Sequence, residues 1–283
     1  MVARRADFAG SWYPGNRSDC EKVIEEFAET ARPCPGGEAP RVGGIVPHAG
    51  WFFSGRTACN VVQCLRGSKE PDTVVLFGRH LHPGSRRYIM TEGEWETPLG
   101  NLQIDGDVAS ALALEFDFTV ETVTQYEQDN TIELQLPFIR YFFPKAGIVP
   151  VGAPPDSESL EIGRRVVDIA VSMGRRLLVL GSTDLTHYGM NYGFSPRGTG
   201  ERAVDWVKKE NDRRVIDRML AMDAQGVLSE AMKSRNACCA GAAAAAISAA
   251  GRMGASEGVE LEYTTSYDIR PDASFVGYVG VLF

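Results

Sequence analysis

Histidine and cysteine side chains are the groups of this sequence best suited to metal chemistry. The chain has only four histidines, which are His48, His80, His82 and His187. Two adjacent thiols, Cys238 and Cys239, precede an alanine-rich run that is typical of a helix, and a helix N-terminus favours a thiolate. Imidazole and thiolate ligands suit iron, copper or zinc, whereas magnesium and calcium prefer oxygen ligands. A site for iron, copper or zinc is therefore a hypothesis, which requires that the fold bring these side chains together.

The histidines follow apolar segments that predict buried strands. His48 follows residues 43–46, His80 and His82 follow residues 72–78, and His187 follows residues 176–182. Ligands of open α/β sheets bind at the carboxyl edges of the strands, so these histidines would meet if the strands are neighbours. One histidine alone is more often a hydrogen-bonded core residue, and the order of the strands does not follow from the sequence.

Asp184 and His187 are three residues apart. If the segment is helical after its strand, both side chains lie on one face. The carboxylate would then orient the imidazole, or the pair would act in acid–base chemistry. The alternative is that Asp184 only caps the following turn.

Apolar strand patterns alternate with helical patterns along the whole chain. This alternation predicts one α/β domain over residues 1–283, with a central, mostly parallel or mixed sheet and helices on both faces. Strands are expected at 43–47, 72–78, 146–153, 176–182, 257–269 and 274–283, with a short strand or ribbon at 101–105. Helices are expected at 18–31, 55–67, 105–116, 130–143 and 156–174, with more than one within 210–234 and one over the alanine-rich run of 238–250. Ser18, with Glu21 three residues on, predicts the start of the first helix. A Pro/Gly loop is expected over 32–41.

Charge and composition exclude several classes of protein. The net charge of -8 disfavours a nucleic-acid partner or an anionic membrane. The longest apolar stretch, in the alanine-rich run, is too short for a membrane span, and the first residues lack the apolar core of a secretory signal. The six cysteines show no regular framework, which predicts reduced thiols and a cytoplasmic location.

Several motifs occur in an order that resembles the Memo-like family, also known as AmmeMemoRadiSam system protein B. They are "AGSWYP", "VPHAGW", "LFGRHLH", "ETPLGNLQID", "NTIELQLPF", "GSTDLTHYG" and Arg-Asn-Ala-Cys-Cys, and together they cover nearly the whole chain. The resemblance implies a fold like that of class III extradiol dioxygenases, with a metal pocket at the edge of the sheet.

The resemblance also implies which residues bind the metal. His48 matches the first histidine ligand of the family, and Cys239, three residues after Asn236, matches its thiol ligand. The second histidine is expected in a segment whose paired histidines are split in this chain. If the loop is shorter by one residue than in the family, His80 aligns with the family's second histidine ligand. His82 is the alternative for that ligand.

Four further residues match positions near the metal in the family. Asp184 and His187 match its aspartate and histidine, and are expected to be catalytic. Asn130 stands where members often have histidine. Glu133 is expected either to point into the pocket or to pack as a structural carboxylate.

The function expected from these residues is that of a non-haem metal protein carrying out redox or oxygen chemistry on an unknown small substrate, with iron or copper bound. If it is an enzyme, we expect a dioxygenase-like oxidoreductase, although a thiolate in place of a carboxylate ligand disfavours cleavage of catechols. One alternative is a zinc hydrolase. Another is a non-catalytic module that binds a peptide or protein. The family also suggests a link to a radical S-adenosylmethionine protein.

Overall fold

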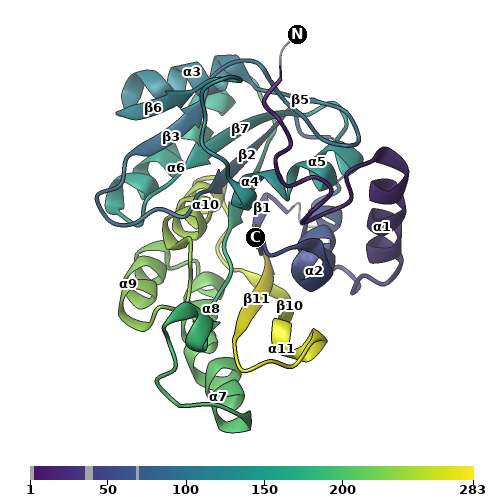
Figure 1. The fold of residues 1–283 in the computed structure, drawn as a ribbon. Coiled ribbons are helices and arrows are strands. Elements are labelled where there is room, and N and C mark those ends of the chain that lie inside the picture. The colour runs from purple at the N-terminus through teal and green to yellow at the C-terminus, as the bar shows by residue number, and fades with distance from the viewer. Residues whose placement is uncertain (1–2, 36–40, 68–69) are drawn as a thin grey trace.

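Four buried strands pair in parallel at the centre of a mixed β-sheet (Figure 1). The computed structural model describes residues 3–35, 41–67 and 70–283. The central strands lie in the order β1 (Gly43–Val46), β8 (Leu177–Ser182), β2 (Thr73–Gly78) and β7 (Gly147–Gly152). Every residue of the first three is buried, as expected for parallel strands covered on both faces.

Antiparallel pairings extend the sheet on both sides of this centre. β11 (Phe275–Leu282) pairs antiparallel with β1, and β10 (Val259–Thr265) with β11. On the other side β3 (Arg87–Met90) pairs antiparallel with β7, and β6 (Phe118–Glu121) lies parallel to β3. β9 (His187–Tyr188) adds to β11. The predicted mixed α/β sheet is therefore confirmed. A separate ribbon joins β4 (Glu94–Trp95) to β5 (Leu102–Gln103).

Helices cover both faces of the sheet. A Cβ on Gly44 of β1 would meet Val61 of α2 (Trp51–Cys64), whereas one on Gly181 of β8 would meet Ala246 of α10 (Ala240–Arg252) and the side chain of Ile45. Because side chains alternate along a strand, α2 and α10 lie on opposite faces. On the first face α1 (Arg17–Glu29) and α5 (Leu136–Phe142) accompany α2, and on the second α6 (Ser157–Ser172) and α9 (Ala224–Ser234) accompany α10, with α3 (Gly106–Glu115) against α6.

Five short helical elements complete the fold of the described residues. They are α4 (Asn130–Glu133), α7 (Glu201–Trp206), α8 (Asp212–Leu220) and α11 (Ser266–Ile269), with a π-helical turn, η2 (Val207–Asn211), between α7 and α8. A single 3₁₀ turn, η1, spans Met190–Tyr192. No helix in the part of the chain that the structure describes is long and apolar enough to cross a membrane.

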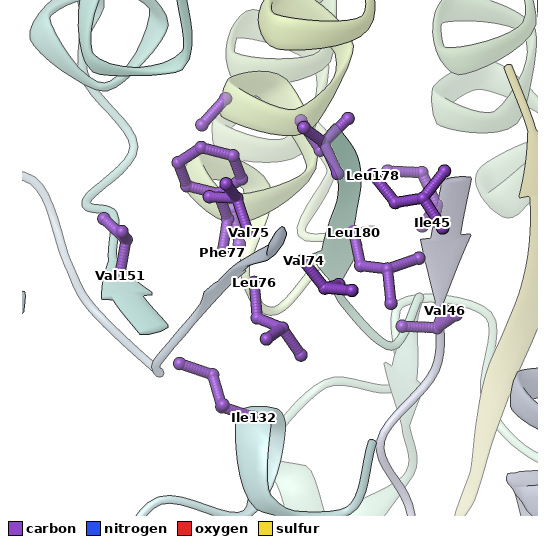
Figure 2. Packing of buried hydrophobic residues seen from close by; sticks show 14 of the residues in the cluster. Ile45, Val46, Val74, Val75, Leu76, Phe77, Ile132, Val151, Leu178 and Leu180 are labelled. Carbon is purple, nitrogen blue, oxygen red and sulfur yellow. The ribbon is translucent and has the colours of Figure 1, made fainter. Parts of the chain in front are cut away.

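The core fills the space between the central strands and their helices. Figure 2 shows Phe77 of β2 near Val151 of β7 and Val74 of β2 near Leu180 of β8, with Ile132 of α4 below Leu76. Between α6 and α10 the packing depends on small residues, because a Cβ on Gly163 would collide with the carbonyl oxygen of Ala245. The alanine-rich run thus lets two helix backbones approach closely.

The N-cap of the first helix and the continuity of the helix over 130–143 differ from the prediction. The first helix starts at Arg17, and its N-cap is Asn16, whose side chain accepts from the Asp19 N–H at 3.0 Å, so the assignment of Ser18 was wrong. The predicted helix over 130–143 is two helices, α4 and α5. Pro137 lies in the first turn of α5, where its missing N–H is tolerated, whereas inside one continuous helix it would clash with the turn before it.

The prediction of reduced cysteines was wrong for one pair. Cys34 and Cys64 form a disulfide with Cα atoms 5.5 Å apart, because the chain that leaves α1 returns beside the end of α2. Cys20, Cys59, Cys238 and Cys239 are free thiols. The cytoplasmic location was predicted from reduced cysteines, and it stays a prediction. The loop expected over 32–41 falls partly outside the described residues.

The close approach of α6 and α10 gives a stability prediction. Gly163→Val should lower the free energy of unfolding by about 1–3 kcal/mol, because the two helices must move apart to accept the side chain. Gly251→Ala is the matched control on α10, where no atom lies within 4 Å of the added Cβ, and should raise stability by at most about 1 kcal/mol. Urea titration measures both. An unchanged midpoint for Gly163→Val would contradict this packing.

Candidate metal centre

Four side chains from three segments meet at the carboxyl edge of β1, β8 and β2. His48 follows β1, His80 follows β2, and Cys238 and Cys239 immediately precede α10. One ligand atom from each lies within 4.8 Å of all the others. Because β8 lies between β1 and β2, the two histidine loops extend from either side of the strand that leads to Asp184.

In this cluster each histidine nitrogen lies close to one cysteine sulfur. Nε2 of His48 lies 3.2 Å from Sγ of Cys238, and Nδ1 of His80 lies 3.5 Å from Sγ of Cys239. The two sulfur atoms are 3.7 Å apart. The imidazole rings are perpendicular, with centroids 4.9 Å apart. The four donors therefore face a common centre.

A hydroxyl group fixes the orientation of the His48 ring. Nδ1 of His48 lies 2.9 Å from Oγ of Ser182, and that hydroxyl donates its one proton to the carbonyl oxygen of Thr131 at 2.7 Å. Nδ1 must therefore be the donor in its contact with Ser182. Nε2 is then the atom that faces the sulfurs, as a metal-binding imidazole requires.

Helix α4 and Gln135, the N-cap of α5, hold the loops around the cluster. The Asn130 amide donates to the carbonyl oxygen of His48 at 3.1 Å, and the Gln135 amide to that of Pro47 at 2.9 Å. The Thr131 hydroxyl accepts from the N–H of Arg79, beside His80, at 2.7 Å. The asparagine at position 130 thus has a positioning role that needs no imidazole.

Glu133 is a structural carboxylate and does not point into the pocket. It is fully buried, and it accepts from the N–H groups of Asp7 and Phe8 at 2.9 and 2.7 Å and from the Tyr13 hydroxyl at 3.0 Å. Burial raises the pKa of Glu133 to about 7, although these hydrogen bonds oppose the shift. Of the two expected roles, packing is the one observed.

Arg79 turns the chain so that His80 reaches the cluster. Its φ of 74° lies in the left-handed region, which is uncommon for a residue with a side chain. Its guanidinium forms ion pairs with Glu121 at 2.7 Å and Glu127 at 2.8 Å and lies over the ring of Tyr88. These contacts hold the strained turn in place.

The adjacent cysteines are fixed to the loop that follows β8. The Cys238 N–H donates to the carbonyl oxygen of Asp184, and the Cys239 N–H to the Thr183 hydroxyl, both at 3.1 Å. In return the Asp184 N–H donates to Sγ of Cys238 at 3.2 Å. Cys239 is the N-cap of α10, as the sequence indicates.

Asp184 and His187 do not share a helix face. The segment after β8 is extended and pairs through β9 with β11, because its backbone hydrogen bonds go to that strand, so the helical reading was wrong. Asp184 accepts from the His48 N–H at 2.8 Å and lies 3.9 Å from Nε2 of that ring. Nδ1 of His187 lies 3.1 Å from the carbonyl oxygen of Leu185, which can only accept, so Nδ1 is the donor in this contact.

Electrostatic interactions favour a charged pair within the cluster. Burial alone lowers the pKa of His48, but the negative charges of Asp184 and Cys238 outweigh it and raise that pKa to about 9. Burial also opposes ionisation of Cys238, yet its hydrogen bond from Cys239 and the charge on His48 lower the Cys238 pKa. Burial and the Cys238 thiolate raise the pKa of Cys239. Imidazolium beside thiolate is the favoured metal-free state.

Two cavities open onto the cluster. The first, of about 780 Å³, combines polar and aromatic walls. Its lining includes Trp12, His48, Phe52, Phe53, His80, Asn130, Asp184, His187, Tyr192 and Tyr278. The second, of about 430 Å³, is more apolar. Its lining includes His80, Leu81, His82, Pro155, Leu185, His187, Tyr192, Met232, Ala237 and Cys238.

The structure brings together three of the four residues predicted as metal ligands. His48, His80 and Cys239 are in the cluster, whereas His82 is exposed on the second cavity and lies outside the group. The family resemblance assigns no role to Cys238, although its position beside Cys239 at a helix start is a usable signal. Ser182 and Thr131 were missed, because nothing local marks a hydroxyl that orients a histidine far away in the chain.

A comparison with solved structures agrees with this fold. An uncharacterized protein from Escherichia coli has a similar structure, with a TM-score of 0.54 and 9% identity over 85% of this chain and 98% of that one. The chain is thus an α/β protein of that fold, with a histidine–cysteine cluster at the edge of its sheet.

The family follows from the sequence comparisons. A family model described as Memo-like protein matches residues 4–282. MEMO1 family proteins of Methanopyrus kandleri and Pyrococcus abyssi are 35% and 34% identical, covering 100% and 97% of this chain and 99% and 97% of theirs. This chain belongs to the Memo-like family.

The charged pair predicts the titration of His48. In metal-free protein its imidazole should titrate near pH 9, so its protonation stabilises the fold below about pH 6.5, and that contribution disappears as the pH rises through about 9. Cys238→Ser should lower the midpoint, because it removes a negative charge. Cys20→Ser, in α1, should leave it unchanged. Histidine NMR spectra measure the midpoint, and an equal midpoint in Cys238→Ser and wild-type protein would contradict the pairing.

Proposed function

We propose that the protein binds one redox-active metal ion, iron or copper, through His48, His80 and Cys239, and oxidises or reduces a small molecule in the cavity of about 780 Å³. The single observation that supports this proposal is the group of four nitrogen and sulfur donors within 4.8 Å of one another.

The spacing of the donors fits one ion. Metal–nitrogen bonds of about 2.0–2.1 Å and metal–sulfur bonds of about 2.3 Å put tetrahedral ligands about 3.6 Å apart for nitrogen and sulfur, and about 3.8 Å apart for two sulfurs. The contacts here are 3.2 and 3.5 Å for the nitrogen–sulfur pairs and 3.7 Å between the sulfurs. The pair His80–Cys239 is thus already at the spacing of two ligands of one ion, and all four donor atoms lie within 4.8 Å of one another.

Cys238 makes the donor set richer than the two histidines and one thiol of the family pattern. With three ligands an ion keeps a position for substrate, whereas a fourth ligand would close a tetrahedral site. The hydrogen bond from the Asp184 N–H to Cys238 favours a thiolate there with or without the metal. We therefore assign metal binding to His48, His80 and Cys239. Cys238 provides a second sulfur beside these ligands, and its charge adjusts the charge of the site.

The residues around the donors supply positioning and proton transfer. A bound iron or copper ion supplies one-electron chemistry. His187 lines the cavity with its Nδ1 bound to Leu185, so its neutral ring would accept a proton from a bound substrate at Nε2. Asp184 is buried and acts through His48, whose backbone and charge it stabilises. Trp12, Phe52 and Tyr192 offer apolar surface to a substrate and reduce its contact with water.

A zinc hydrolase is the second candidate. His187 beside the cluster could serve as the base that such an enzyme needs, and the two sulfurs suit zinc as well as copper. The identity of the metal separates the two functions, because zinc has no redox chemistry.

Metal content tests the proposal. Protein purified anaerobically should hold one iron or copper ion per chain, measured by mass spectrometry, and the triple variant His48→Ala, His80→Ala, Cys239→Ser should hold none. His82→Ala is the matched control and should keep the metal, because His82 lies outside the cluster.

Two results would contradict the proposal. Equal metal content in the triple variant would remove the assigned ligands, and zinc as the only bound metal, with no redox activity, would favour hydrolysis. Circular dichroism shows whether the triple variant is folded, so that loss of metal is not mistaken for loss of structure.

A further inference from the structure

Cys238 and Cys239 are chain neighbours whose sulfur atoms already lie side by side. The sulfurs are 3.7 Å apart and both thiols are free. Their backbone N–H groups are held by the carbonyl oxygen of Asp184 and the hydroxyl of Thr183. Since these anchors are protein groups, the arrangement of the two sulfurs does not require a bound ion.

The two thiols differ in access. Cys238 is half-buried and lines the cavity of about 430 Å³, whereas Cys239 is 2% exposed and lies behind it. The other free cysteines, Cys20 and Cys59, are 0% exposed. A small reagent in this cavity therefore meets Cys238 before any other free thiol of the described chain.

We propose that Cys238 and Cys239 form a redox pair that reduces small hydroperoxides and is itself oxidised to a vicinal disulfide. The sulfur of Cys238 attacks the outer oxygen of the hydroperoxide, so that an S–O bond forms and the O–O bond breaks. Cys238 becomes a sulfenic acid, and the departing alkoxide or hydroxide takes the thiol proton and leaves as an alcohol or water. The sulfur of Cys239 then attacks the sulfenic sulfur, and the displaced hydroxide takes the thiol proton and leaves as water. Two thiols lose two electrons and one peroxide gains them.

The resulting disulfide should be easily reduced. Adjacent Cα atoms are about 3.8 Å apart, below the range of about 4.4–6.8 Å that disulfides usually span. Strained disulfides have more oxidising potentials, so a small thiol can restore the pair. The cycle is thus complete with a hydroperoxide as the oxidant and a thiol as the reductant.

The oxidation also bears on the metal site, and this consequence rests on the proposed function. A disulfide removes both thiolates from the donor group and leaves only His48 and His80. Thiolates are the softer ligands of the set, so the oxidised protein should lose affinity for iron or copper. Hydroperoxide would then regulate occupancy of the site.

The test uses the full chain, freed of metal with a chelator and exposed to hydrogen peroxide. Trypsin releases residues 236–252, which contain both cysteines of the pair and no others. This peptide should lose the mass of two hydrogen atoms and regain it after treatment with a thiol, while Cys20 and Cys59 stay reduced. A peptide that gains only oxygen, or stays unchanged, would overturn the proposal.

Matched variants test the order of the two steps. In Cys239→Ser a sulfenic acid should accumulate at Cys238, where a cyclic 1,3-diketone traps it. In Cys238→Ser the reaction of Cys239 should fall to the level of Cys20 and Cys59. Equal trapping in the two variants would overturn the roles assigned here.

The same experiment on protein loaded with zinc distinguishes this proposal from the proposed function. Zinc is redox-inert, and prior loading should protect the peptide from oxidation if the thiols bind the ion. Oxidation to the disulfide that is unaffected by zinc would support the redox pair and contradict the metal site. Protection by zinc, with oxygen addition in place of the disulfide when zinc is absent, would support the metal site and contradict the redox pair.

Discussion

Three parallel strands that end at the same edge of the sheet are the constraint on which the site depends. β1, β8 and β2 are adjacent, so the loops that follow them must leave the sheet side by side. Because the strands are buried on both faces, a shift in their register would expose apolar side chains. His48, His80 and Asp184 thereby come together although they lie far apart in the sequence.

Position at the edge is not sufficient for a binding site, and α4 supplies the additional precision. This helix is only four residues long, yet its side chains and backbone contact the loops of both histidines and the hydroxyl of Ser182. Glu133 on the same helix holds the N-terminal segment, which brings Trp12 to the cavity. The elements that orient the ligands and those that shape the pocket are thus connected through one short helix.

Local patterns predicted much of the fold, whereas long-range contacts account for what was missed. The apolar runs of β1, β2 and β8 identified the central strands, and histidines placed directly after them indicated a site at the edge. Pro137 has no backbone N–H and is itself a local signal that the helix over 130–143 is divided in two. The Cys34–Cys64 disulfide, the role of Ser182 and the extended path of Asp184–His187 depend on partners distant in the chain, for which one sequence carries no local signal.

X-ray absorption at the metal edge of anaerobically loaded protein tests the central claim most directly, because it reports which atoms surround the ion. Two imidazoles and at least one thiolate around a single cation predict nitrogen neighbours at about 2.0–2.1 Å and sulfur at about 2.3 Å in the same spectrum. A first shell of oxygen and nitrogen without sulfur would contradict this account, since the thiols before α10 would then take no part in holding the metal.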